Sequence, residues 1–252
     1  IKVKKENTTD ALLFISKAQV EALAQCVING ETDKAIYKQA LQRNPSVDMA
    51  LFGRMVASDP SLNYDACAQV AHSISTHEVR NEYDYFTAVD DCETKEQAGA
   101  GHLGAVEFNS ATLYRYATIN IKDLMKYLGA ETAQTVDAFV KSFLLSMPTG
   151  KQNTFANRTV PNFAYITLRQ DQPVNLAGAF EKPIYEGQGG YVSKSLQALE
   201  EYAKKTYTSF VTQPTKTYCI GEQTTMGETF SLEEVLKDLH HEISTYYEGA
   251  SE

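Results

Sequence analysis

The stretch at residues 75–110, STHEVRNEYDYFTAVDDCETKEQAGAGHLGAVEFNS, limits the possible folds more than any other part of the chain. Its two ends, residues 79–89 and 103–108, alternate aromatic or β-branched residues with other types, which is typical of β-strands. A polar segment that ends in Ala-Gly-Ala-Gly connects them, so the stretch predicts a β-hairpin. The connection is too long for a tight turn, and the arms are too polar to lie wholly in a core. We therefore expect the hairpin to project from the fold.

The bulk composition indicates a globular protein. A chain of 252 residues with 43% hydrophobic and 22% charged residues can bury a full core, as one domain or as one domain with an insertion. No apolar run approaches the ~20 residues of a membrane span, and no signal peptide opens the sequence. We therefore expect a soluble, cytoplasmic protein with no membrane partner.

Cysteine and histidine spacing argues against a metal site. The four cysteines lie far apart without a CxxC pair, and the five histidines show no metal-ligand spacing. This pattern favours reduced thiols over a disulfide framework or a zinc site. The sequence therefore predicts no metal and no cofactor.

The charge of the chain is acidic but unevenly distributed. A net charge of −9 and a pI of about 5.1 argue against nucleic acid, which normally requires a basic surface. Residues 138–170, however, contain no Asp or Glu and include Lys141, Lys151, Arg158 and Arg169. Because a polyanion needs a local positive surface rather than a positive total, binding to nucleic acid stays open. A chance gap between acidic residues explains the pattern equally well.

Hydrophobic periodicity and capping residues predict interleaved helices and strands. The predicted helices cover residues 16–28, 32–43, 131–147, 193–210 and 231–247, with a loop at 148–161. Besides the hairpin arms, the predicted strands cover residues 47–52, 66–76, 108–121, 162–168 and 215–220. Residues 66–76 also fit a helix, and we favour a strand because they lead directly into the hairpin. Since regular βαβ repetition is missing, we expect an α+β fold with an antiparallel sheet and helices on one face.

No part of the sequence predicts a convincing active site. Asp90 and Asp91 are neighbours, so on a strand they point to opposite faces, and a solvated turn is the simpler interpretation. The segment EGQGGY at 186–191 matches neither a dinucleotide-binding motif nor a P-loop, and we interpret it as a flexible loop. His72 and His77 could act as general bases, but a single histidine beside small residues more often makes a structural hydrogen bond.

Ordered blocks of the sequence resemble one family. VDMALFGRMVASDPSLNYDACAQVAHSISTHEVRNEYDYFTAVDD at 47–91 and GAGHLGAVEFNSATLYRYATINI at 99–121 are similar to the CasC family, the CRISPR-RNA-binding backbone subunits of type I-E Cascade. PTGKQNTFA at 148–156 and NLAGAFEKPI at 175–184 match later blocks of that family. The family begins with a strand and a basic segment that grips the RNA backbone. We find no such segment from Ile1 onward, so we expect the sequence to cover only part of the subunit.

The resemblance implies a hand-shaped protein with an RRM-like (ferredoxin-like) palm. Residues 1–45 would be the remainder of a helical finger domain, residues 46–221 the palm, and residues 222–252 a C-terminal helix packing on the palm. Residues 76–107 would form a β-hairpin thumb, which is polar because it reaches over RNA held by a neighbouring subunit. Copies would polymerise head to tail along crRNA with other Cascade subunits, a heterologous and non-closing assembly. The filament would present its guide to target DNA in antiviral defence, without enzymatic activity.

The resemblance also assigns candidate contact residues. Lys151, Gln152 and Thr154 would lie beside the RNA and contact phosphate and sugar, blind to sequence. Lys34 and Lys38, one helical turn apart, align with a lysine-bearing helix directed at duplex DNA. The thumb and the GRM loop at 53–55 would interrupt the stacked RNA at regular intervals, through Arg54, Met55, Phe86, Thr87, His102 and Leu103. Apolar and aromatic surface suits this role because base stacking on it tolerates any guide sequence.

Each assignment has a plain alternative. Met55, Phe86 and Leu103 could be core residues, and the lysines could be ordinary surface residues. For the whole protein, an RRM-fold endoribonuclease that processes CRISPR RNA is the alternative, but it needs a positioned general acid or base, and we can place none. A small-molecule enzyme that uses the glycine-rich loop at 186–191 is a third interpretation.

Overall fold

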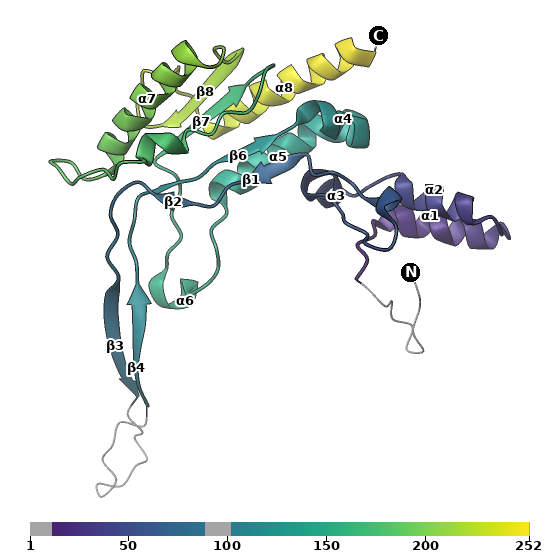
Figure 1. Ribbon diagram of the computed structural model, residues 1–252, viewed down its shortest axis with the longest axis horizontal. Helices are drawn as coiled ribbons and strands as arrows, with labels where there is room; N and C mark the ends of the chain where they lie inside the picture. Colours follow the sequence, from purple (N-terminus) through teal and green to yellow (C-terminus); the bar gives the residue numbers. More distant parts are fainter. Residues whose placement is uncertain (1–11, 89–101, 252) are drawn as a thin grey trace, which may run out of the picture. The chain divides into compact units, whose positions relative to one another are not determined.

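The computed structural model describes residues 12–88 and 102–251. These residues form two compact units, drawn in Figure 1. The described part of the first unit consists of residues 12–71, 117–168 and 216–251. That of the second consists of residues 72–88, 102–116 and 169–215. The chain therefore enters the second unit twice, once through the hairpin region and once through a helical segment.

The first unit contains most of the described helices. The α-helices are α1 (Lys17–Ile28), α2 (Lys34–Gln42), α3 (Val47–Phe52), α4 (Ile121–Leu128), α5 (Thr132–Leu145), α6 (Gln152–Phe155) and α8 (Leu232–Ser251). Short 3-10 helices cover Pro60–Leu62 and Gly129–Glu131. The strands are β1 (Ala68–Val70), β6 (Ala117–Ile119), β7 (Phe163–Leu168) and β8 (Lys216–Gly221), of which β1 pairs with β6 and β7 with β8.

The second unit carries the hairpin and one long helix. Its strands are β2 (Ile74–Ser75), β3 (Glu82–Ala88), β4 (His102–Phe108) and β5 (Leu113–Tyr114). Strand β2 pairs with β5, and β3 pairs with β4, antiparallel in both cases. Helix α7 (Val192–Ser209) packs on a 3-10 helix at Ala177–Phe180. The described chain is thus a mixed α and β fold with small antiparallel sheets.

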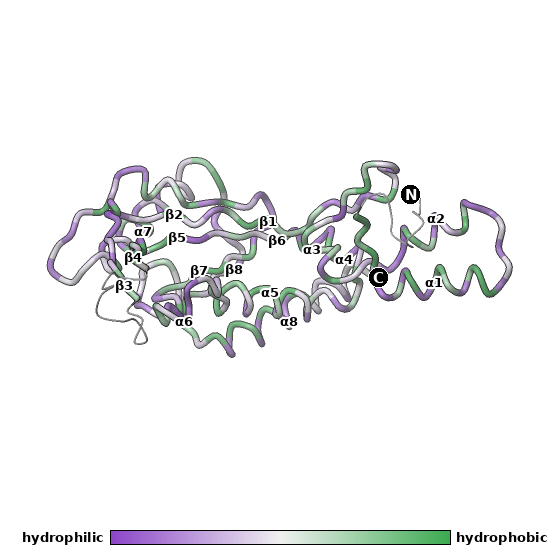
Figure 2. Tube along the Cα trace, turned by 90° about the horizontal axis from the view of Figure 1, so that it is seen from below, coloured by the Kyte–Doolittle hydropathy of each residue, from purple (hydrophilic) through white to green (hydrophobic). Residues whose placement is uncertain are grey.

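The core of the first unit is built where α5 lies along α8. Val235, Leu239 and Ile243 repeat every four residues along α8, so they share one helix face, and each is at most 3% exposed. Leu124 of α4 and Tyr218 of β8 join the same buried cluster. Figure 2 shows hydrophobic and hydrophilic residues interleaved along helix α1.

Most of the elements expected from the sequence are confirmed. The Ser16 hydroxyl accepts a hydrogen bond from the Gln19 amide at 3.1 Å, and the Gln19 side chain accepts one from the Ser16 amide at 3.3 Å. This capping box begins α1, as predicted. A second one begins α8, where the Glu234 carboxylate accepts from the Ser231 amide at 2.8 Å. The hairpin arms, the strands near 163–168 and 216–221 and the helices α5 and α7 are also present.

The predicted strand at 47–52 is wrong, because these residues form helix α3. The Ser46 hydroxyl accepts from the Met49 amide and caps the helix. Met49, Ala50 and Leu51 are consecutive and all buried, which an alternating strand does not allow. A six-residue apolar run is too short to separate the helical from the strand period, and the capping serine was the better signal.

Residues 108–121 are not one long strand either. Strand β4 ends at Phe108, and only the short strands β5 and β6 follow. The Asn120 side chain then accepts from the Asp123 amide at 3.1 Å and starts α4, a helix that the sequence reasoning missed. The predicted loop at 148–161 contains the one-turn helix α6.

Other expectations concern topology and thiols. Within residues 12–88 and 102–251, no helix combines the length and apolar character needed to cross a membrane. Cys26 and Cys67 carry free thiols, and Cys92 lies outside the described residues. Burial raises the pKa of the Cys67 thiol to about 11. The division into fingers, palm and thumb stays a prediction.

Candidate nucleic-acid interface

The β3–β4 hairpin exposes both of its faces. All seven residues of β3 are exposed, although they pair in register with seven residues of β4. Among the described elements, β3 and β4 pack mainly on each other. Its two strands are labelled β3 and β4 in Figure 1. It therefore offers two surfaces to a partner and buries neither within the described chain.

The pairing register divides the candidate residues between these faces. Phe86 lies opposite Gly104, and Thr87 lies opposite Leu103. Because cross-strand partners share a face and neighbours along a strand do not, Phe86 and Leu103 point to opposite sides of the hairpin. The two side chains therefore cannot both contact a base that lies on one face of the hairpin. His102 pairs with Ala88, and its side chain lies outside the described ones.

One face is aromatic, and sequence reasoning missed it. Tyr83 and Tyr85 share the face of Leu103, and the three side chains are 58%, 75% and 68% exposed. On the other face, the Phe86 ring covers Gly104, where an added Cβ would lie 2.5 Å from the ring. The alternation of tyrosines in EYDYF was the available signal. Phe86 itself remains 41% exposed, so it does not pack as a core residue in the described chain.

The arm carries no basic side chain in β3, and none in β4 apart from His102. Its charged residues are Glu82, Asp84 and Glu107. Carboxylates repel phosphates, so backbone contacts to a nucleic acid are not favoured here. The surface suits apolar or stacking contacts with bases, or contacts with a protein.

The base of the hairpin is fixed by His77. Its Nε2 accepts from the Thr112 amide at 3.0 Å, which leaves Nδ1 protonated to donate to the Glu78 carbonyl at 2.7 Å. The ring also stacks on Tyr191 with centroids 3.8 Å apart. Both nitrogens thus serve the backbone, in agreement with a structural role.

Arg54 is buried in the first unit, with only 6% of its surface exposed. The guanidinium donates to three backbone carbonyls, those of Phe14, Leu41 and Leu62, and to Gln19 Oε1 at 3.1 Å. Its pKa is lowered because burial disfavours the charged form. In the described chain, Arg54 ties α1, the end of α2 and the segment after α3 together rather than facing outward.

Met55 lies next to Arg54 and points the other way. It is 81% exposed, so burial in the core is wrong for this residue in the described chain. Gly53 ends α3 with φ +79°, and a Cβ there would meet the Tyr64 carbonyl oxygen at 2.9 Å. Arg54 and Tyr64 then form an antiparallel bridge. Because adjacent residues in extended backbone alternate in direction, burying Arg54 places Met55 outside.

Lys151, Gln152 and Thr154 lie together at the one-turn helix α6. Lys151 adopts the left-handed conformation with φ 59°, and its ammonium lies 5.9 Å from the centroid of the Phe155 ring. Lys151 and Thr154 are exposed, and Gln152 Oε1 accepts from Arg158 at 3.4 Å. The loop therefore presents one cation and neutral hydrogen-bonding groups.

Two other predicted cations are already paired. Lys38 contacts Asp59 at 3.0 Å, which reduces its availability to DNA, whereas neighbouring Lys34 is exposed on the same helix without an ion pair in the described chain. Arg169 binds Asp171, the first acid after the acid-free stretch, at 2.8 Å. Met55 and α6 belong to the first unit, and the hairpin belongs to the second.

No metal-binding group was found in the described residues. Within 12–88 and 102–251, no three side chains of His, Cys, Asp or Glu gather as a metal site would require. Asp90 and Asp91 lie outside this part of the chain.

Comparison with solved structures gives two informative matches. A chain of a CRISPR RNA-guided surveillance complex in a pre-nicking state is 28% identical, with a TM-score of 0.78, and the match covers 95% of this chain and 73% of that one. A chain of a second CRISPR RNA-guided surveillance complex is 29% identical, with a TM-score of 0.67, over 90% and 86% of the two chains. Both support the predicted relation to Cascade-type proteins.

Comparison at the level of sequence gives the family. None of the curated proteins compared with this chain matches it. The family described as CT1975-like protein matches residues 1–243, which is nearly the whole sequence. The protein therefore belongs to the CT1975-like protein family.

Proposed function

We propose that the chain is a CasC-type backbone subunit of a type I-E Cascade. It binds crRNA, polymerises head to tail with further copies along that guide, and presents the guide for pairing with target DNA. Its relation to chains of CRISPR RNA-guided surveillance complexes supports the Cascade-type role. In this proposal the chain has no catalytic role, and its partners are crRNA, target DNA, other copies and other Cascade subunits.

The observation that carries the proposal is the hairpin with two exposed faces. A two-stranded hairpin is marginally stable by itself, so an arm that buries neither face is suited to a surface outside its own fold. Its apolar side chains and carboxylates favour bases over phosphates. Stacking against such side chains is worth about 1–3 kcal/mol per base and tolerates any sequence, which a guide-independent scaffold requires.

The proposal extends to the architecture. The residues around β1, β6, β7 and β8 form an RRM-like palm, helices α1 and α2 belong to the fingers, and the hairpin is the thumb. Backbone contacts come from the α6 loop, through Lys151, Gln152 and Thr154. Met55 and Leu103 act on the bases, while Phe86 serves the opposite face of the thumb.

Chemical probing of guide RNA in the assembled filament tests the central claim. We expect reactive nucleotides at even intervals, and we expect Met55→Ala combined with Leu103→Ala to blur that spacing while the filament persists. Leu113→Ala is a matched control, because Leu113 is 54% exposed on β5, outside the hairpin. Phe86→Ala, probed separately, shows which thumb face meets the displaced base. Uniform protection along the guide would overturn the proposal.

The α6 loop is tested by salt dependence. Lys151→Ala should weaken binding equally for unrelated guides and flatten the slope of log K against log salt by about one unit. Lys122→Ala on α4 removes another exposed lysine and should leave the slope unchanged. An unchanged slope for Lys151→Ala would remove this residue from the interface.

The DNA and catalytic parts of the proposal have their own tests. Charge reversal of Lys34 and Lys38 should weaken binding of target duplex and spare binding of guide RNA; a parallel loss of both would indicate a folding or assembly defect. Labelled repeat RNA incubated with the pure protein should stay intact. Clean cleavage at one site would favour the endoribonuclease instead.

A further inference from the structure

Two adjoining hollows lie on the second unit, away from the hairpin in sequence. One has a volume of about 540 Å³ and is lined by residues 171–172 and 208–212. The other, of about 370 Å³, includes Asn175, Tyr202 and Lys205 in its lining. Gln172, Phe210 and Val211 line both. Volumes of this size match ordinary ligand sites of roughly 300–1,000 Å³.

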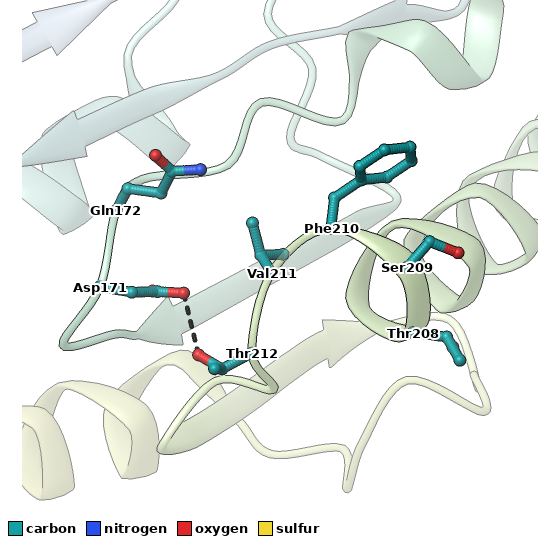
Figure 3. Close-up of a pocket in the computed structure, with 7 residues that line it drawn as sticks. All are labelled: Asp171, Gln172, Thr208, Ser209, Phe210, Val211 and Thr212. Atoms are coloured by element: carbon teal, nitrogen blue, oxygen red, sulfur yellow. Dashed lines mark hydrogen bonds between the residues drawn. The ribbon is translucent and has the colours of Figure 1, made fainter.

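Phe210 lines both hollows. It follows the last residue of α7 and is 83% exposed, an unusual state for a large aromatic side chain. Figure 3 shows Gln172 and Phe210 on opposite sides of Val211. Because the ring is exposed and lines both hollows, it can receive a flat group.

The salt bridge between Arg169 and Asp171 holds the rim of the first hollow in place. Arg169, whose side chain is 6% exposed, donates to both Asp171 oxygens at 2.9 and 2.8 Å and to the Thr212 carbonyl at 2.6 Å. The Thr212 hydroxyl donates to Asp171 at 2.9 Å, the bond drawn in Figure 3. These contacts join the segment after β7 to the segment after α7. They also hold the pKa of Asp171 well below its usual range, so that carboxylate is neutralised by Arg169.

The remaining groups are complementary to a nucleotide. Lys205 is exposed and makes no ion pair within the described chain. Asn175 Oδ1 accepts from the Tyr114 hydroxyl and from the Ala177 amide, so its amide nitrogen is left to donate. The Gln172 side chain is exposed beside it. A cation, two amides and an exposed ring are the groups that phosphate, base edges and base faces require.

We propose that these hollows bind single-stranded nucleic acid. A base stacks on the exposed ring of Phe210, Lys205 contacts a phosphate, and Gln172 and Asn175 form hydrogen bonds with base edges. This site is additional to the guide-binding surface proposed above, since it uses other residues. The ligand is a single strand of RNA or of DNA, and the test below distinguishes these sources.

The test uses the full chain preloaded with unlabelled guide RNA. Labelled single strands of about 8 nucleotides, within the range that single-strand binders cover, are titrated as DNA and as RNA of the same sequence, and binding is followed by anisotropy. Phe210→Ala should weaken binding of the preferred strand by about 10-fold, as expected for the loss of base stacking. Tyr185→Ala is the matched control, because Tyr185 is 76% exposed and lines neither hollow.

Lysine variants add an independent readout. Lys205→Gln should lower the salt slope of strand binding by about one unit, whereas Lys204→Gln, a neighbour that lines neither hollow, should not. Guide loading, measured in parallel, should be the same in every variant. Unchanged strand affinity in Phe210→Ala would overturn the proposal. If strand affinity is unchanged and the variant no longer binds another protein subunit of the complex, the surface would be assigned to a protein partner.

Discussion

The β3–β4 and β7–β8 sheets have nearly the same backbone and opposite environments. Both are antiparallel pairs with an uninterrupted register, of seven and six residue pairs. In β8, Tyr218 packs in the core cluster with residues of α5 and α8, and neighbouring Cys219 is also buried, whereas every residue of β3 is exposed. The two sheets therefore differ in what covers them rather than in how they pair.

This difference indicates which sheet holds the fold and which one is free for function. Cross-strand pairs contribute only about 0.2–1 kcal/mol each, so backbone pairing alone leaves a hairpin marginal. The β7–β8 pair gains its stability from the core beneath it. The β3–β4 pair keeps its side chains available, so its aromatic and apolar groups can be used by a partner.

The largest expected effect is the contrast between two tyrosines. Tyr218 is 2% exposed and donates to Asp238 at 2.7 Å, so Tyr218→Ala removes a buried ring and should cost about 3–5 kcal/mol of stability. Tyr85 is 75% exposed, and Tyr85→Ala should stay within about 0.5 kcal/mol of the wild type. Urea unfolding of both variants measures the difference. Equal losses would show that the β3–β4 hairpin is part of the core.

A second contrast separates two adjacent residues. Arg54→Met leaves the carbonyls of Phe14, Leu41 and Leu62 without their buried donor, so stability should fall by about 2 kcal/mol or more. Met55→Ala, at an exposed position, should stay within about 0.5 kcal/mol. Thermal unfolding without RNA measures both. An unchanged melting temperature in Arg54→Met would contradict the structural role of Arg54 and favour its predicted role as a contact residue.

Local signals explain why much of the fold was predictable. The hairpin has alternation in both arms, and α1 and α8 have capping boxes that involve neighbours in the chain. The strand prediction for Val47–Phe52 was wrong because the helix formed by these residues depends on burial against α4 and β1, which a six-residue pattern does not encode. The short strands β5 and β6 likewise depend on partners distant in sequence.

The candidate site was predictable in part and for the same reason. Exposure of Met55 follows only after Arg54 is known to be buried by carbonyls from three separate segments. Pairing of Arg169 with Asp171 depends on a loop closed by Thr212, so a count of charges could not reveal it. Phe86 and Leu103 lie on opposite faces of the hairpin, which could be inferred only from the pairing register of β3 and β4. The sequence does not determine that register, because the connection between the strands is long.

A smaller effect is expected inside the β3–β4 hairpin. Gly104→Ala places a Cβ 2.5 Å from the Phe86 ring, which must swing away from the strand. Because the ring is exposed and can move, stability should change by less than about 1 kcal/mol. Amide hydrogen exchange should accelerate in β3 and β4 and stay unchanged in β7 and β8. Unchanged protection of the β3 and β4 amides from exchange would show that the Phe86 ring does not stabilise the hairpin.

The smallest effect concerns the charges that join β8 to α8, for which β3 has no counterpart among the described residues. Lys216 contacts Asp238 and, at 2.8 Å, Glu242, and its hydrogen bond holds the pKa of Asp238 below the usual value. A carboxyl with a depressed folded-state pKa stabilises the protein above its unfolded pKa of about 3.9, and that contribution is lost as pH falls through the acid range. The pair is partly exposed, so solvent screening keeps the contribution small. Asp238→Asn should therefore lower Tm slightly at about pH 7 and bring it closer to the wild type at about pH 3. A Tm difference that does not change between these pH values would show that this carboxylate does not hold β8 on α8 through its charge.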